Sequence, residues 1–196
     1  GGNNFGINAI DTDYTLILNP NVICSEDLFD NISEVINEDN DFSIIGCQYL
    51  YDKIFMPAGF FDNKENEKFT KYFKNDEIND LTKVDWVTGC SMLLNIKKFD
   101  NKKIFDENFF LYFEEFDLCK SLKKRGEKVY SSKKLKIHHL GFKSSFEENS
   151  SHRKSINRLR EWHWMWSSFY FYKKNFSYLY ALRKILGKLL KSALKV

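Results

Sequence analysis

Short apolar runs alternate with longer mixed segments along the first 140 residues. The runs are rich in β-branched and aromatic residues, and Asp, Asn, Gly or Pro flank several of them, features typical of buried strands. They span residues 14–18, 42–50, 84–94, 128–132 and 135–141. Strands separated by helical and irregular segments indicate an α/β sandwich with a mixed sheet.

Two segments of this region have the pattern of helices. In the first, residues 25–35, Ser25 can cap the start and apolar residues recur on one face. The second, residues 114–125, has acids in its first turn and bases in its last, with Gly126 placed to end it. Between the strands, residues 62–83 are polar and charged, and we expect a surface excursion there.

The chain changes character toward its C-terminus. Three Trp and a run of Phe and Tyr lie among Lys and Arg, and apolar residues from Leu179 to Leu194 fall on one helical face. This pattern predicts an amphipathic basic helix behind an aromatic belt. We therefore expect two units, a body at 1–147 and a helical tail at 148–196.

The net charge of +3 conceals a division between these units. Residues 152–196 hold eleven Lys and Arg against one acid, whereas the preceding 151 residues hold nineteen against twenty-six. A basic aromatic tail, here 158–196, suits an anionic membrane surface. The alternative is a helix that packs on the body or on a dimer partner. We expect no nucleic-acid partner, because the acidic body would repel a polyanion.

Composition excludes several other classes. The four Cys residues (24, 47, 90 and 119) have no paired spacing, which favours reduced thiols in a cytosolic protein. The sequence contains neither an apolar run of about eighteen residues nor a signal peptide. It begins Gly-Gly-Asn-Asn without Met, so we expect a fragment that lacks its N-terminal part.

Three carboxylates, Glu114, Glu115 and Asp117, stand within four residues in a stretch rich in aromatic side chains. One interpretation is that these acids complement the dipole of the predicted helix on a solvated face. The other is that one of them is a general base in a partly apolar pocket, where burial raises its pKa into a useful range. The local pattern alone leaves both open.

Several motifs in order resemble the family-2 glycosyltransferases, especially the bacterial rhamnosyltransferase-like branch. They are "GGNNFGINAIDTDYTLILNPNV", "VDWVTGCSMLLNIKKF", "IFDENFFLYFEEFDLCKSLKKRGEKV" and "IHHLGFKSS", and they extend over residues 1 to about 146. The resemblance implies a GT-A fold that lacks its first strands, which in the family carry the main base contacts. It also implies inverting transfer of a sugar from a nucleotide-diphosphate donor, possibly dTDP-rhamnose. The acceptor would be a saccharide or a lipid-linked saccharide in surface polysaccharide synthesis.

By this resemblance the catalytic base is Glu115, where the family usually has Asp. Glu114 and Asp117 would shape the site or cap the helix. Inverting transfer needs such a base for the acceptor hydroxyl and positive charge for the departing diphosphate.

The metal motif is expected after the first strand. The acids of "DTD" at 11–13 precede that strand, so we reject them, because ligands collect beyond the carboxyl ends of strands. Asn19-Pro20-Asn21 lies at that end and matches the family's Asn-Pro-Asp. An amide oxygen at Asn21 can ligate Mg²⁺ or Mn²⁺, although an Asx turn is the structural alternative. The resemblance places His139 at the metal or diphosphate, and His138 would face the other way.

The resemblance also suggests a nucleotide-sugar site formed by Asn4, Asn19, Trp86 and Gly89. The Gln-x-x-Arg-Trp motif of processive synthases is absent, which favours the addition of a single sugar. We expect a cytoplasmic enzyme, peripheral on the inner face of the membrane. The alternative is an inactive sugar-nucleotide or membrane-binding module, since Glu115 and Asn21 both replace Asp.

Overall fold

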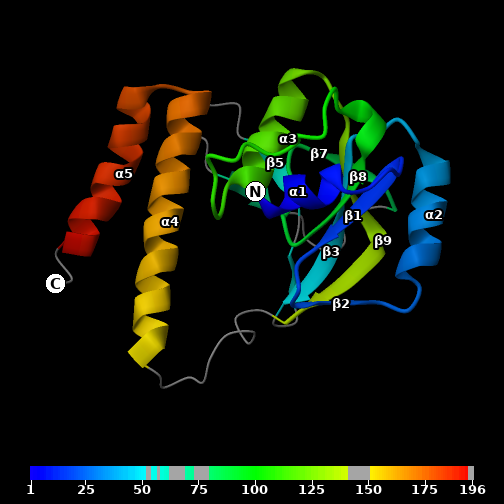
Figure 1. Cartoon of the computed structure of the whole chain (residues 1–196), viewed down its shortest axis with the longest axis horizontal. Helices are drawn as coiled ribbons and strands as arrows, with labels where there is room; N and C mark the ends of the chain where they lie inside the picture. The colour runs from blue at the N-terminus through cyan, green and yellow to red at the C-terminus, as the bar shows by residue number, and fades with distance from the viewer. Residues whose placement is uncertain (52–53, 57, 62–68, 73–79, 141–150, 194–196) are drawn as a thin grey trace.

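The structure is a computed structural model that describes residues 1–51, 54–56, 58–61, 69–72, 80–140 and 151–193 (Figure 1). Its elements, in chain order, are α1 (Gly2–Asn8), β1 (Tyr14–Leu18), β2 (Val22–Cys24), α2 (Leu28–Glu38), β3 (Ile44–Tyr51), β4 (Ile54–Met56), β5 (Gly59–Phe61), β6 (Phe69–Tyr72), β7 (Thr82–Val84), β8 (Ser91–Asn95), the 3₁₀ turn η2 (Ile96–Lys98), α3 (Glu114–Lys124), β9 (Val129–His139), α4 (Ser151–Asn175) and α5 (Tyr178–Ala193).

The main sheet is mixed, as the sequence predicts. Its strand order is β1-β8-β3-β9-β2, with β4 added beside β3 and β7 beside β9. β3 and β9 are parallel, whereas β8 is antiparallel to both β1 and β3. β1, β3 and β9 therefore run in one direction, and their carboxyl ends lie along the same edge of the sheet.

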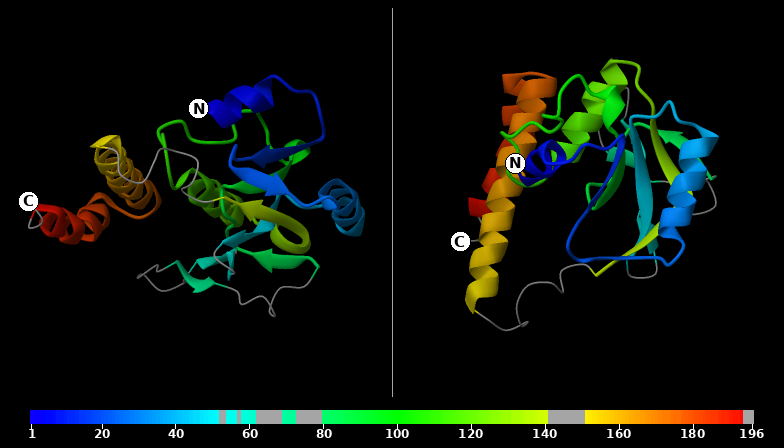
Figure 2. Two further views of the ribbon diagram at one scale, coloured as in Figure 1. Left: turned by 90° about the horizontal axis from the view of Figure 1, so that it is seen from below. Right: turned by 45° about the vertical axis from the view of Figure 1, so that its right-hand side comes forward.

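Helices cover both faces of this sheet (Figures 1 and 2). On one face, Leu28 and Val35 of α2 pack with Ile45 and Leu93. On the other face, Ile7 of α1 and several residues of α3 belong to a core cluster with strand residues such as Ile44 and Leu94. The alternation of side chains along each strand sends neighbouring residues to opposite faces, so each face has its own core cluster.

Two expectations about strands were wrong in detail. The long apolar run at 84–94 is divided between β7 and β8, with a non-strand segment at 85–90 between them. The two strands expected at 128–132 and 135–141 are the single strand β9, whose pairing with β3 shifts register between Cys47 and Gln48. A local irregularity inside one strand was interpreted as a turn between two.

The helix near residue 25 also differs from its prediction. α2 begins at Leu28 with Asp27 as its N-cap residue, while the Ser25 hydroxyl donates to the carbonyl of Lys136 in β9. Within the polar excursion at 62–83, the described residues include β6 and the first two residues of β7.

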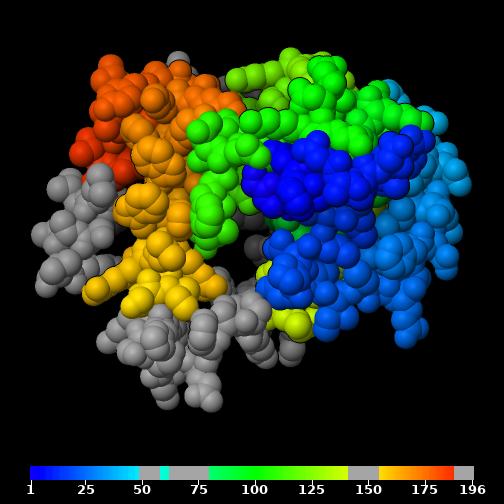
Figure 3. All heavy atoms as spheres, in the orientation of Figure 1, coloured from blue at the N-terminus to red at the C-terminus, as the bar shows by residue number. Residues whose placement is uncertain are grey.

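The tail forms two helices that lie side by side (Figures 1 and 2). α4 packs on the body through an aromatic cluster in which Phe171 meets Phe109 and Phe113. Figure 3 shows α4 against the segment that leads into α3. None of the helices in the described ranges is long and apolar enough to cross a membrane. The predicted boundary at residue 147 lies outside the described residues.

Candidate active site

The backbone is strained immediately before α3. Tyr112 and Phe113 both have left-handed conformations, with φ of 69° and 68°. For residues with a β-carbon this costs on the order of 1–2 kcal/mol each, so surrounding contacts must hold it. Phe113 is 4% exposed, and its ring packs against Trp164 and Phe171 of α4. The aromatic cluster therefore fixes the direction in which the first turn of α3 points.

The first two residues of α3 form a buried acid pair. Oε2 of Glu114 and Oε2 of Glu115 are both buried, and neither has a hydrogen-bond partner in the described part of the chain. The Glu115 side chain lies over Gly89, where an added β-carbon would stand 3.3 Å from Glu115 Cδ. Gly89 thus leaves room for the Glu115 side chain, and its predicted part in a nucleotide-sugar site stays a prediction.

This environment makes both acids weak. Burial, followed by the neighbouring charge of Glu114, raises the pKa of Glu115 to about 8. Burial also raises the pKa of Glu114. Two carboxyl groups in one poorly solvated place resist double ionisation, so the pair retains a proton at neutral pH. Such a pair can accept or release a proton near physiological pH, which is the property of a general acid or base.

Other predicted site residues lie at the carboxyl edge of the sheet. The Asn19 N–H donates to the carbonyl of Cys90, next to Gly89, at 3.0 Å. The carbonyl of Asn21 accepts from Leu140, and His139 is paired with Val22. The rejected Asp13 lies at the opposite end of β1, in an ion pair with Lys97 at 2.6 Å. The topology therefore brings Asn19, Asn21, Gly89 and His139 to one edge.

These residues do not fit a resident divalent cation. Among the described residues no three His, Cys, Asp or Glu side chains are grouped so as to hold a metal ion. Asn21 and His139 offer only neutral donors, and burial followed by the charge of His138 lowers the pKa of His139. Mg²⁺ and Mn²⁺ prefer carboxylate oxygens. The loop at 142–144 that the sequence places near His139 is outside the described residues.

Asn4 and Trp86 make structural contacts within the body, and their predicted contact with the nucleotide stays a prediction. The buried amide of Asn4 donates to the Phe105 carbonyl at 2.8 Å and accepts from the Phe105 N–H at 2.9 Å. Trp86 is 2% exposed and meets the Phe116 ring edge-on at 5.0 Å. These contacts position the segment before α3 and the first turn of α3 itself.

Asp117, the third predicted acid, belongs to a different group. Its Oδ2 lies 2.6 Å from Lys174 Nζ, and its Oδ1 accepts from Asn175 at 3.0 Å. Lys174 also meets Asp106 at 2.7 Å, so one lysine of α4 joins two acids of the body. We call Asp106, Asp117, Lys174 and Asn175 the α4 anchor. The anchor could not be predicted from the sequence, because nothing in the sequence distinguishes Lys174 from the other bases of the tail.

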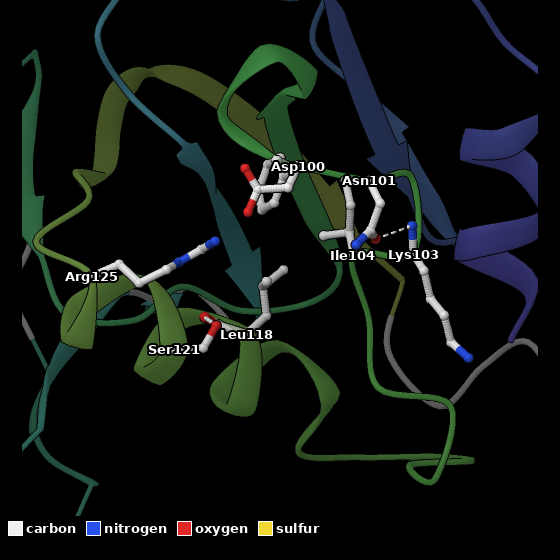
Figure 4. Close-up of a pocket in the computed structure, with 8 residues that line it drawn as sticks. Asp100, Asn101, Lys103, Ile104, Leu118, Ser121 and Arg125 are labelled. Carbon is white, nitrogen blue, oxygen red and sulfur yellow. Dashed lines mark hydrogen bonds between the residues drawn. The ribbon is translucent and has the colours of Figure 1, made fainter.

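A separate pocket of about 250 Å³ lies between residues 99–104 and the second half of α3 (Figure 4). It is lined by Phe99, Asp100, Asn101, Lys103, Ile104, Leu118, Ser121 and Arg125. None of the predicted site residues borders it.

The structure thus defines an α/β protein with a mixed sheet and a buried acid pair. No family model matches the chain. Rhamnosyltransferase WbbL of Escherichia coli (strain K12) is 28% identical over an alignment of 137 residues, and the match covers 61% of this chain and 49% of that protein. The chain spans about half the length of this curated relative. The similarity indicates a distant, glycosyltransferase-like relationship.

Among solved structures, the one titled "Crystal Structure of A197 from STIV" aligns with a TM-score of 0.44 at 13% identity. It covers 69% of this chain and 62% of that chain. A likeness of this extent identifies neither the fold family nor the function.

Proposed function

We propose that the chain is part of an inverting glycosyltransferase with a GT-A body, and that Glu115 is its general base. The observation that carries the proposal is the buried, unpartnered carboxyl oxygen of Glu115 above Gly89, next to the carboxyl edge of the sheet. Ligands of open α/β sheets bind at this edge. The distant similarity to a rhamnosyltransferase supports the same reaction class.

In this mechanism the ionised Glu115 takes the proton of an acceptor hydroxyl. The hydroxyl oxygen forms a bond to the anomeric carbon of the donor sugar while the bond to the nucleoside diphosphate breaks. The configuration inverts, and the proton remains on Glu115 until it passes to solvent. A raised pKa makes Glu115 a stronger base once it is ionised, since basicity rises with the pKa of the conjugate acid.

The neighbouring residues adjust this base. Burial raises the pKa of Glu115 most, and the charge of Glu114 raises it further. The left-handed backbone at Tyr112 and Phe113, which the aromatic cluster fixes, sets where both acids lie at the start of α3. A positioned base contributes about 10²–10⁴-fold to such a transfer, and part of that depends on this alignment.

The donor would be a nucleotide-diphosphate sugar, with dTDP-rhamnose the first candidate, and the acceptor a saccharide or lipid-linked saccharide. We derive no step through Mg²⁺ or Mn²⁺ from the residues described. A requirement for either ion stays a prediction, and turnover measured with EDTA and then with added Mn²⁺ tests it.

We also propose that the tail docks on the cytoplasmic face of an anionic membrane. Leu159, Trp162 and Trp166 of α4 are 57%, 55% and 47% exposed, and the two Trp rings are parallel. The surplus of Lys and Arg at 152–196 complements anionic lipid. Co-sedimentation with anionic vesicles should be lost with neutral vesicles and weakened by Trp162→Ala together with Trp166→Ala. Equal sedimentation with both vesicle types would contradict the proposal.

The decisive experiment measures turnover of UDP-, dTDP- and GDP-sugars by the natural protein with any segment upstream of Gly1 restored. A lipid-linked acceptor is supplied, and Glu115→Gln is compared with wild type. Turnover of one donor that Glu115→Gln abolishes supports the enzyme and its base together. Donor binding without turnover by either form favours the inactive binding module instead.

A further inference from the structure

A second polar side chain on the same face of the sheet is buried and has one atom with no hydrogen-bond partner among the described residues. Gln48 in β3 is 4% exposed, and its Nε2 has no hydrogen-bond partner in the described part of the chain. A buried amide that donates to nothing is costly, so native proteins rarely keep one without a reason. The sequence singled out no function for this residue.

Alternation along β3 gives the face on which Gln48 lies. Ile44 belongs to the core cluster that includes residues of α3, and a β-carbon added at Gly46 would stand 2.6 Å from the side chain of Val87. Every second residue of a strand lies on the same face, so Gln48 shares the face of Ile44 and Gly46. Gly89, over which Glu115 lies, is two residues after Val87 in the chain. Gln48 therefore shares the face of the acid pair, further toward the carboxyl end of β3.

The local backbone is also irregular at this point. The pairing of β3 with β9 runs from Cys47 opposite Ser132 directly to Gln48 opposite Lys136. The extra residues belong to β9, so β3 keeps its own alternation. Irregularities of this kind are common beside active sites, where they redirect side chains.

The chemistry of the unpartnered atoms is complementary to a sugar. Gln48 Nε2 can only donate hydrogen bonds, whereas an ionised Glu114 or Glu115 can only accept them. A pyranose carries hydroxyl groups that do both. A purely apolar ligand would leave all of these atoms unsatisfied.

We propose that Gln48 is a substrate-binding residue whose Nε2 donates to an oxygen of the donor sugar ring or its hydroxyls. This assignment rests on the proposed function, because the ligand is taken to be a sugar nucleotide. It adds a sugar contact from the sheet, on the same face of the sheet as the acid pair of α3.

The test is isothermal titration of the natural protein with the panel of UDP-, dTDP- and GDP-sugars and with the matching free nucleoside diphosphates. Gln48→Met keeps the length of the side chain and removes the donor. We expect at least tenfold weaker binding of the sugar nucleotide, with binding of the free diphosphate changed less than twofold. The melting temperature should be unchanged or higher, because a buried unpaired amide is removed.

Ser91→Ala is the matched control. Ser91 is wholly buried in the neighbouring strand β8, two positions from Leu93, which packs with α2 on the opposite face. Ser91→Ala should leave the affinities for the sugar nucleotide and for the free diphosphate unchanged. Unchanged sugar-nucleotide binding in Gln48→Met, an equal loss for the free diphosphate, or no binding of the panel by wild type would each overturn the assignment. Binding without turnover contradicts the proposed reaction alone, and the Gln48→Met titration then still decides this contact.

Discussion

Two groups of carboxylates stand within twelve residues of each other, and their surroundings differ completely. Oε2 of Glu114 and Oε2 of Glu115 are buried and have no hydrogen-bond partner among the described residues, and burial raises the pKa of both acids. Asp106 and Asp117 belong to the α4 anchor, where Lys174 contacts both. For Asp106, burial is outweighed by hydrogen bonds from Lys174 and Asn108, which lower the pKa to about 2.

The difference shows that neighbouring acids can divide two tasks between them. Asp106 is held in its charged form, and Asp106 and Asp117 together connect α4 to the body. In the ranges that the structure describes, the acid pair has no counter-ion, which is unfavourable for folding and suits proton transfer. The anchor and the aromatic cluster stabilise the part of the chain in which the unfavourable pair sits.

The largest expected effect comes from neutralising the base. Glu115→Gln should lower turnover about 10²–10⁴-fold, because it removes the proton acceptor and keeps the shape of the side chain. Circular dichroism should show an intact fold. Glu114→Gln is the comparison, since Glu114 only adjusts the base, and a smaller loss is expected. Equal losses in the two variants would contradict the assignment of Glu115.

The second prediction concerns the pH dependence of turnover. A base must be ionised, and the pKa of Glu115 is raised to about 8, so kcat/KM should rise roughly tenfold per pH unit up to about pH 8. The rate is measured from pH 5.5 to 9.5. A profile that is already level at pH 6 would mean that no group with a raised pKa controls the reaction.

The third prediction separates the anchor from the pair. Lys174→Met should lower the free energy of unfolding by about 2 kcal/mol, less than for a fully buried pair because Lys174 is 39% exposed. Urea unfolding measures this. Lys173→Met removes a neighbouring exposed lysine and should change stability by less than about 0.5 kcal/mol. Similar effects of the two variants would remove the distinction between Lys174 and an ordinary surface base.

The fourth prediction is that the two groups of acids respond to pH with opposite signs. Because the folded-state pKa of Glu115 is raised from 4.5 to about 8, its protonated form favours the folded state, and that stability is lost as pH rises between these values. Glu115→Gln should therefore gain melting temperature over wild type as pH rises from 5 to 8.

The anchor gives the reverse dependence. Because the folded-state pKa of Asp106 is lowered from 3.8 to about 2, its charged form favours the folded state, and that stability is lost as pH falls between these values. Asp106→Asn should be less stable than wild type near pH 5 and approach it near pH 2. If the difference in stability between wild type and either variant, Glu115→Gln or Asp106→Asn, did not change with pH, the prediction for that acid would be contradicted.

The smallest effect is expected at Gly89. A methyl group there would press on Glu115 Cδ from 3.3 Å and displace it by a few tenths of an ångström. We expect Gly89→Ala to lower kcat about tenfold with little change in stability, since catalysis is sensitive to such displacements. Gly6→Ala, where the added carbon meets nothing within 4 Å, is the matched control.

The sequence predicted the local structure well where the pattern is local. The strand at 14–18 and the helix from 114 have the expected start and nearly the expected end. The run at 84–94 misled, because an apolar segment that crosses the sheet has the same composition as a buried strand. Only the course of the backbone, and not the composition, distinguishes such a crossing segment from a strand.

The site was predictable only in part. The motif at 114–117 marked the three acids, and the position of Asn19 after β1 was read correctly from the strand rule. The resemblance singled out Glu115 among these acids, but the ion pair of Asp117 could not be predicted, since it depends on Lys174, 57 residues away from Asp117. Gln48 resembled any polar residue of a strand, and only its burial without a partner marks it.

The anchor also has a consequence for the order in which the protein assembles. During synthesis the residues of the sheet and α3 emerge before α4, and domains fold as they emerge. Until Lys174 and the aromatic residues of α4 arrive, nothing in α4 compensates Asp117 or holds Phe113 in its left-handed conformation. A nascent chain halted before Ser151 should therefore show a protected sheet, and a first turn of α3 that exchanges its amide hydrogens rapidly. The acid pair would be the last part of the body to mature.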